Sequence, residues 1–98
     1  MTREHILKTW PNAWHAVRDG KKMFEWRKDD RGFEVGDVLV LRQWDPAPFG
    51  NLLQPIGYVR PGAGQYVDLR VVVTYILRGQ FGVPPDYCVM GIAFEGVG

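Results

Sequence analysis

One stretch of strict two-residue alternation constrains the fold of this chain more than any other feature. In residues 67–77 every odd-numbered position is apolar or aromatic, while Asp68, Arg70 and Thr74 occupy even-numbered positions. Because successive side chains of a β-strand point to opposite faces, this stretch is predicted to be a long strand with one face in the core. A half-buried strand needs hydrogen-bonded partners and a covered face, so a sheet must form around it.

Shorter apolar runs supply the partners for that strand. The predicted strands are residues 5–8 (at an edge), 23–27, 38–41, a short piece at 56–59, and 87–94. Residues 38–41 are apolar throughout, which is typical of a strand covered on both faces. Five or six strands leave open edges unless the sheet closes. We therefore expect an α+β, mainly β fold: a small mixed β-barrel.

One short helix is predicted near the N-terminus, over residues 11–19. Pro11 suits the first helical position, and Gly20 suits the residue after the last turn. One apolar face follows from the helical spacing of Trp10, Ala13, Trp14 and Val17. We expect this helix to pack on the barrel with Trp14 in the core. Strand alternation places Trp26 in the core as well.

The length fits a single domain spanning residues 1–98. Hydrophobic residues make up 46% of the chain, enough for a packed core. Residues 45–64 differ from the rest, since they contain four prolines and four glycines. A connection of that length inside a compact domain is typical of a functional loop, and we expect a flap here.

Several chemistries are excluded or disfavoured by what the sequence contains. The chain has no serine, and its single cysteine, Cys88, lies in an apolar run typical of a buried thiol. His5 and His15 lack cysteine partners at ligand spacing, so no metal site is expected. The chain also lacks a glycine-rich phosphate-binding loop, so no cofactor is expected. We find no apolar segment long enough for a membrane span or a signal peptide and expect a soluble, cytoplasmic protein.

Charge concentrates locally, although the net charge is only +1. A basic cluster between residues 18 and 31 comprises Arg18, Lys21, Lys22, Arg27, Lys28 and Arg31. Within it, strand alternation puts Lys22 on the face opposite Glu25, so the two meet only if Lys22 lies in a turn before the strand. If they meet beside Arg27, the group suits phosphate or base binding, or proton transfer, or a purely structural ion-pair network.

The segment Gly20-x-Lys22-x-x-Glu25-x-Arg27 resembles the Gly-x-Lys-x-x-Glu-x-Arg signature of ASCH domains, a branch of the PUA-like β-barrels. Over nearly its whole length the chain resembles an ASCH-like bacterial and phage family described as a domain of unknown function (DUF 3850). Beside the signature, the resemblance is carried by His5-x-Leu7-Lys8-Thr9-Trp10-Pro11, by Asp30-Arg31-Gly32-Phe33-x-Val35-Gly36-Asp37 and by Val73-Thr74-Tyr75-Ile76.

This resemblance implies a PUA/ASCH-like barrel with a cleft beside the signature strand, suited to RNA or a modified nucleobase. Relatives in the superfamily include ribonucleases and an amidohydrolase that deacetylates N4-acetylcytidine. In that hydrolase a threonine stands at the Glu25 position and a later strand supplies a glutamate. Here the later strand has no glutamate, and Asp68 and Thr74 are the nearest substitutes. The departure favours binding over catalysis.

The principal expectation is therefore a module that binds RNA, a nucleotide or a nucleoside. The expected ligand-binding residues are Lys8, Trp10, Lys22, Glu25, Arg27, Arg31 and Trp44, the last as a stacking ring beside the long loop. One alternative is a small hydrolase in which Lys22 and Glu25 are the catalytic acid–base pair. A second is an interaction protein without a ligand, in which these charges are structural. The sequence does not determine the oligomeric state.

Overall fold

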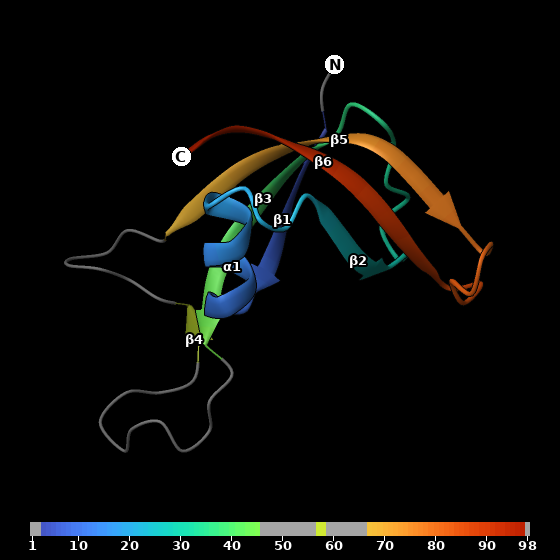
Figure 1. Ribbon diagram of the computed structural model, residues 1–98, viewed down its shortest axis with the longest axis horizontal. Coiled ribbons are helices and arrows are strands. Elements are labelled where there is room, and N and C mark those ends of the chain that lie inside the picture. Colours follow the sequence, from blue (N-terminus) through green and yellow to red (C-terminus); the bar gives the residue numbers. More distant parts are fainter. Residues whose placement is uncertain (1–2, 46–56, 59–66, 98) are drawn as a thin grey trace.

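The computed structural model describes residues 3–45, 57–58 and 67–97, and the statements below concern these residues. They form one helix and six strands in the order β1, α1, β2, β3, β4, β5 and β6 (Figure 1). Their bounds are β1 Glu4–Thr9, α1 Pro11–Arg18, β2 Phe24–Lys28, β3 Val38–Asp45, β4 Gly57–Tyr58, β5 Asp68–Arg78 and β6 Tyr87–Val97.

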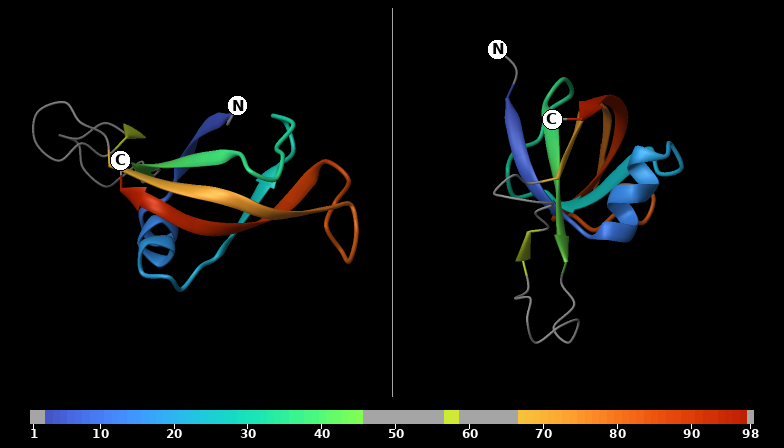
Figure 2. Two further views of the ribbon diagram at one scale, coloured as in Figure 1. Left: turned by 90° about the horizontal axis from the view of Figure 1, so that it is seen from above. Right: turned by 90° about the vertical axis from the view of Figure 1, so that its left-hand side faces the viewer.

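Five strands form one sheet in the order β1-β3-β5-β6-β2, with the two-residue β4 paired to the end of β3. The β1–β3 pair is parallel, and the other pairs are antiparallel. The sheet curls around α1 into a half-barrel whose two edges are β1 and β2 (Figure 2). The predicted mainly β class, with five or six strands and one short helix, is confirmed. The expected barrel is a half-barrel in the described part of the chain.

Helix α1 packs against the concave face of the sheet. Pro11 occupies its first turn, and Gly20 takes a positive φ of 74° just beyond its end, as the sequence predicts. Trp14 and Val17 are buried, and the Trp14 Nε1–H donates to the carbonyl oxygen of Leu41 at 3.0 Å. The helix therefore joins the sheet through both apolar contact and a buried hydrogen bond.

The core lies between α1 and the concave face. Its buried members are Leu7, Trp14, Val17, Phe33, Leu39, Leu41, Leu69, Val71, Val73, Cys88, Met90 and Ile92. On the opposite, outer face of β3, Val38 and Val40 are also buried. The register explains why: Arg70 of β5 forms an ion pair with Glu4 of β1 at 2.8 Å, and β3 lies between those two strands. Residues 38–41 are thus covered on both faces, as expected.

One predicted face assignment is wrong. The alternation in β2 suggested that Trp26 points into the core, yet Trp26 and Phe24, which shares its face, are about half exposed and Glu25 is buried instead. Because Glu25 pairs in register with the buried Met90 of β6, it must share the inner face. The strand is therefore turned over relative to the expectation, and its aromatic rings lie on the outer face.

The long strand β5 departs from strict alternation at one point. Leu69, Val71 and Val73 are fully buried, as predicted, but the register with β6 shifts between Val73 and Tyr75. The extra residue turns Tyr75 outward and brings Ile76 against the core. Strand β6 is longer than predicted, since it continues to Val97.

Of the predicted loop at residues 45–64, the structure describes only β4 and residue 45. β4 pairs with the end of β3, with Trp44 opposite Tyr58, which agrees with the short strand expected at 56–59. The expected flap lies outside the described residues. Among the residues described, no helix has the length and apolar character needed to cross a membrane.

Candidate functional site

The signature residues Lys22 and Glu25 do meet, and they do so in the way that strand geometry requires. Lys22 precedes β2, which begins at Phe24, so its side chain does not follow the strand alternation. Its Nζ donates to Glu25 Oε1 at 2.8 Å and to the carbonyl oxygen of Phe24 at 2.6 Å. The turn before the strand therefore places this lysine on the inner face beside Glu25.

Arg27 engages the other oxygen of the same carboxylate. Its Nε donates to Glu25 Oε2 at 2.9 Å, and its two terminal nitrogens donate to the carbonyl oxygen of Lys8 and to Thr9 Oγ1. Lys8 and Thr9 belong to β1, the far edge of the sheet. The arginine thus links the two edge strands and holds Glu25 at the same time.

These groups form the base of an open pocket of about 310 Å³. It is lined by Lys8, Thr9, Trp10, Asn12, Ala13, Lys22, Glu25, Trp26 and Arg27. The wall of the pocket is formed by the first turn of α1, the end of β1 and the middle of β2. A volume of this size is at the lower end of the range for small-molecule sites.

The carboxylate at the centre of the ion-pair network is buried, whereas the two cations that contact it are partly exposed to solvent. The Glu25 side chain is only 3% exposed, whereas those of Lys22 and Arg27 are 22% and 23% exposed. Lys22 has used two of its three N–H donors and Arg27 three of its five. Each cation therefore keeps donors for a ligand while the carboxylate fixes its position.

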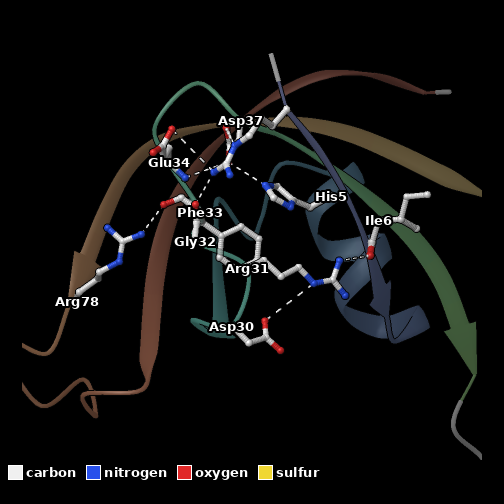
Figure 3. Close-up of polar contacts among 10 residues, drawn as sticks. His5, Ile6, Asp30, Arg31, Gly32, Phe33, Glu34, Asp37 and Arg78 are labelled. Atoms are coloured by element: carbon white, nitrogen blue, oxygen red, sulfur yellow. Dashed lines mark hydrogen bonds and ion pairs between the residues drawn. The ribbon is translucent and has the colours of Figure 1, made fainter. Parts of the chain in front are cut away.

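Five of the seven predicted ligand residues line this pocket: Lys8, Trp10, Lys22, Glu25 and Arg27. Trp44 does not line it; its ring lies 5.1 Å from Lys8 Nζ, on the neighbouring strand. Arg31 does not line it either. Its Nη1 donates to the carbonyl oxygen of Ile6 at 2.8 Å, so it contacts the edge of β1 (Figure 3).

Sequence reasoning missed four lining residues: Thr9, Asn12, Ala13 and Trp26. Trp26 was assigned to the core because aromatic and charged residues alternate along this strand, and the aromatic side was taken as the buried one. A signal for Asn12 was present, since the first turn of a helix that directly follows β1 has to lie near the end of that strand. Asn12 adds an exposed carboxamide to the rim.

A second polar cluster surrounds the buried Asp37 carboxylate (Figure 3). Its Oδ2 accepts from Arg3 Nη2 at 2.8 Å and from the Glu34 amide at 3.0 Å, and lies 2.8 Å from His5 Nε2. Burial by itself raises the pKa of Asp37, but the hydrogen bonds from Arg3, His5 and the Glu34 amide outweigh it and lower that pKa overall. This cluster joins β1 to the turn before β3.

Neither cluster has the composition of a metal centre. Within the described part of the chain, no three His, Cys, Asp or Glu side chains gather to hold a metal ion. The two residues considered as substitutes for the later-strand glutamate are absent from the pocket. Asp68 pairs with Arg42 at 2.9 Å, and Thr74 lies at the irregularity of β5 with an exposed side chain.

Comparison with known proteins gives a family match over most of the chain. A family model described as "Domain of unknown function (DUF3850)" matches residues 4–92. The chain is also 41% identical over 44 residues to a protein of Escherichia phage P2, "Uncharacterized 12.9 kDa protein in GpA 3'region". That similarity covers 45% of this chain and 40% of the phage protein, so it spans less than half of either.

Proposed function

The chain belongs to the family described as Domain of unknown function (DUF3850), and we propose that it binds RNA or a modified nucleotide in the pocket of Lys22, Glu25 and Arg27. The carrying observation is the combination of a fixed ion-pair network with two exposed indole rings. Trp10 is 57% exposed and Trp26 is 48% exposed, and both line the same pocket. Aromatic rings beside cations are the usual means of holding an unpaired nucleobase and its phosphate.

The charges of the pocket favour an anionic ligand. Its lining holds three cations, Lys8, Lys22 and Arg27, against one carboxylate, Glu25, which leaves a formal charge of +2. The remaining donors of Lys22 and Arg27 suit phosphate oxygens or the acceptor edge of a base. Asn12 offers both a donor and an acceptor for a base edge. The ASCH-like signature gives independent support for a nucleic-acid ligand.

Binding accounts for the geometry better than hydrolysis does. The pocket lining contains one carboxylate, and both of its oxygens already accept from cations. A hydrolase built on Lys22 and Glu25 would need a second group to activate water or protonate the leaving group. Asp68 is paired with Arg42 in the sheet and does not line the pocket.

A direct test is the binding of a short fluorescein-labelled single-stranded RNA, followed by anisotropy at low and at physiological salt. We expect saturable binding that weakens as salt rises. Lys22→Ala should weaken it at least about tenfold, because a charge-assisted contact to phosphate is lost. Trp10→Ala should also weaken it, through loss of a stacking ring on a side chain too exposed to be needed for folding.

Lys21→Ala is the matched control, since Lys21 is the adjacent lysine and is not among the lining residues. It should bind as the parent does. Circular dichroism melts show whether each variant is folded. The absence of saturable binding by the parent at low salt would contradict the proposal. Equal losses of affinity for Lys21→Ala and Lys22→Ala would contradict it as well. A lower melting temperature of Lys22→Ala without any change in binding would assign the network a structural role.

A further inference from the structure

The outer face of the sheet carries a second aromatic surface that begins at the pocket. We propose that this surface, formed by Phe24, Trp26, Tyr75, Leu77, Tyr87 and Val89, binds the continuation of a single-stranded nucleic acid whose first nucleotide occupies the pocket. The inference rests on the proposed function and deepens it: the ligand is an oligonucleotide rather than a free nucleotide. We call these six residues the outer aromatic surface.

The strand register places these side chains together. Phe24 of β2 and Tyr75 of β5 both pair with Gly91 of β6, which lies between them. Because neighbouring strands are about 4.8 Å apart, the two aromatic residues flank a glycine across a gap of roughly 10 Å. Gly91 has no side chain of its own, and Thr74 Oγ1 and Tyr75 Cβ lie 3.0 Å and 3.5 Å from the position that a Cβ would take there, so Phe24 and Tyr75 flank a low position that Thr74 partly fills.

A second row of the outer aromatic surface runs parallel to the first. Trp26 and Leu77 both pair with Val89, and the Trp26 ring lies 6.3 Å from that of Tyr87, centroid to centroid. Tyr75 is 62% exposed, and Phe24 and Trp26 are each about half exposed. The surface therefore presents aromatic rings from β2, β6 and β5, three successive strands of the sheet, on one face.

The outer aromatic surface and the pocket share residues. Trp26 lines the pocket and is also part of the outer surface. Lys22 Nζ, which binds Glu25 at the pocket base, lies 4.8 Å from the centroid of the Phe24 ring. A strand of nucleic acid leaving the pocket past Lys22 therefore meets Phe24 and Trp26 directly.

Charge also favours a nucleic acid on this surface. The side chains of β2 that point outward with Phe24 and Trp26 include Lys28, which pairs in register with Tyr87. No ion pair of Lys28 occurs among the described residues. The outward positions of the paired β6 segment, from Tyr87 to Ala93, hold no acidic residue. Aromatic stacking positions next to an unpaired lysine suit successive bases and a phosphate.

At the other end of the same face, around β3, ion pairs cover the apolar residues. There, Arg70 pairs with Glu4 and Arg42 with Asp68 across the outer side of β3 and its neighbours. Those ion pairs cover the apolar residues of the strand beneath them, as Val38 and Val40 show. Among the described residues, no ion pair of this kind lies over the outer aromatic surface, and Phe24, Trp26 and Tyr75 stay about half exposed or more.

The test compares ligands of increasing length: a mononucleotide, a trinucleotide and a hexanucleotide of single-stranded RNA, each competing against a labelled hexanucleotide. We expect affinity to rise with length in the parent protein. Tyr75→Ala should leave the mononucleotide affinity unchanged, because Tyr75 does not line the pocket, and should weaken hexanucleotide binding at least about fivefold. Phe81→Ala is the matched control, since Phe81 is 91% exposed and lies outside the outer aromatic surface.

The outcomes separate this inference from the function on which it rests. Lys22-dependent binding of the mononucleotide, with no gain from length and no effect of Tyr75→Ala on the hexanucleotide, would overturn the inference and leave the pocket proposal standing. Failure of all three ligands to bind would remove both. Sedimentation of the parent and of Tyr75→Ala covers the protein alternative: a concentration-dependent dimer that the substitution abolishes, without change in RNA binding, would assign the surface to a second copy of this chain.

Discussion

Two carboxylates, Glu25 and Asp37, are buried among the described residues, and each accepts hydrogen bonds from more than one residue. Strand alternation placed Lys22 opposite Glu25, so the sequence predicted that they meet only if Lys22 lies in a turn before the strand, and the structure meets that condition. Spacing could not show which face of β2 is buried. The inner face of β2 confronts the unpaired edge of β1, whose carbonyl groups need donors, and Arg27 supplies one of them. That requirement outweighs the burial of Phe24 and Trp26.

Asp37 gives a pH dependence whose sign follows from its environment. Burial raises its pKa, but the hydrogen bonds from Arg3, His5 and the Glu34 amide lower it below that of an ordinary aspartate. A group with a depressed folded-state pKa stabilises the fold above its unfolded pKa of about 3.9 and loses that contribution as pH falls through the folded value. Asp37→Asn should therefore lower the free energy of unfolding near neutral pH, by about 1–3 kcal/mol for a buried hydrogen-bonded group.

Urea denaturation of the parent and of Asp37→Asn at a series of pH values measures this difference. The difference in free energy of unfolding between the two proteins should be constant near neutral pH and should become smaller below about pH 4. Asp86→Asn is the control, because Asp86 is exposed and should change stability by less than about 0.5 kcal/mol. A gap that persists unchanged into acid would show that the Asp37 charge contributes nothing.

Among the secondary-structure elements, β1 is one of the two edge strands of the described sheet. It pairs only with β3 within the described sheet, so its other edge is open. Guanidinium groups occupy that edge: Arg27 donates to the Lys8 carbonyl at 3.0 Å and Arg31 to the Ile6 carbonyl at 2.8 Å. Arginine side chains thus complete the half-barrel between β1 and the β2 region, where a closed barrel would have backbone hydrogen bonds.

Arg31→Ala tests this contact without disturbing the pocket, because Arg31 does not line it. Its side chain is about half exposed, so we expect a modest loss of roughly 0.5–1 kcal/mol in global stability. The larger effect should be local. Hydrogen–deuterium exchange of the amides in Glu4–Thr9 should become faster, while that of β5 and β6 stays unchanged.

Arg18→Ala serves for comparison, since Arg18 has similar exposure, forms an ion pair with the adjacent Asp19, and has its guanidinium 5.7 Å from the centroid of the Trp14 ring in α1. It should leave exchange in β1 unaltered. If both variants gave the same exchange pattern, the Arg31–Ile6 contact would have no role in holding the edge strand.

How well the elements could be foreseen depended on what sets each boundary. Helix α1 followed from Pro11, Gly20 and an apolar face, which are local signals. The long strand β5 followed from alternation. Its register shift near Thr74 did not, because an extra residue in a strand depends on how β6 curls across it and leaves no local mark.

In the part of the chain that the structure describes, the molecule is a curled sheet with one helix in its concavity, and the sequence predicted that mainly β class from the number of strands. It did not predict that the sheet stays open, since closure depends on whether β1 and β2 pair. Nor did it show that the inner and outer faces each carry aromatic rings near β2. Trp26 belongs to both surfaces because it stands on an edge strand at the pocket rim. A single-sequence pattern assigns such a residue to one face only.

Cys88 reports on the cooperativity of this whole fold. It lies in β6, between β2 and β5, and is 0% exposed. Burial, reinforced by the nearby Asp29 carboxylate, raises the pKa of the Cys88 thiol, so the reactive thiolate is suppressed in the folded protein. We expect thiol reagents to modify Cys88 only when the sheet opens, and the free energy derived from the labelling rate should equal that from urea unfolding.

The raised pKa of Cys88 also predicts how the stability of the protein depends on pH. A group whose folded-state pKa is raised contributes its full stability below the unfolded thiol pKa of about 8.5 and loses it as pH rises towards the folded value. The parent should therefore lose stability in alkali relative to Cys88→Ala, although that variant is less stable at neutral pH because it leaves a small cavity. Labelling far faster than global unfolding, with a weak dependence on urea, would mean instead that β2 detaches from β6 by itself. The half-barrel would then open at its pocket edge, and the fold would not be a single cooperative unit.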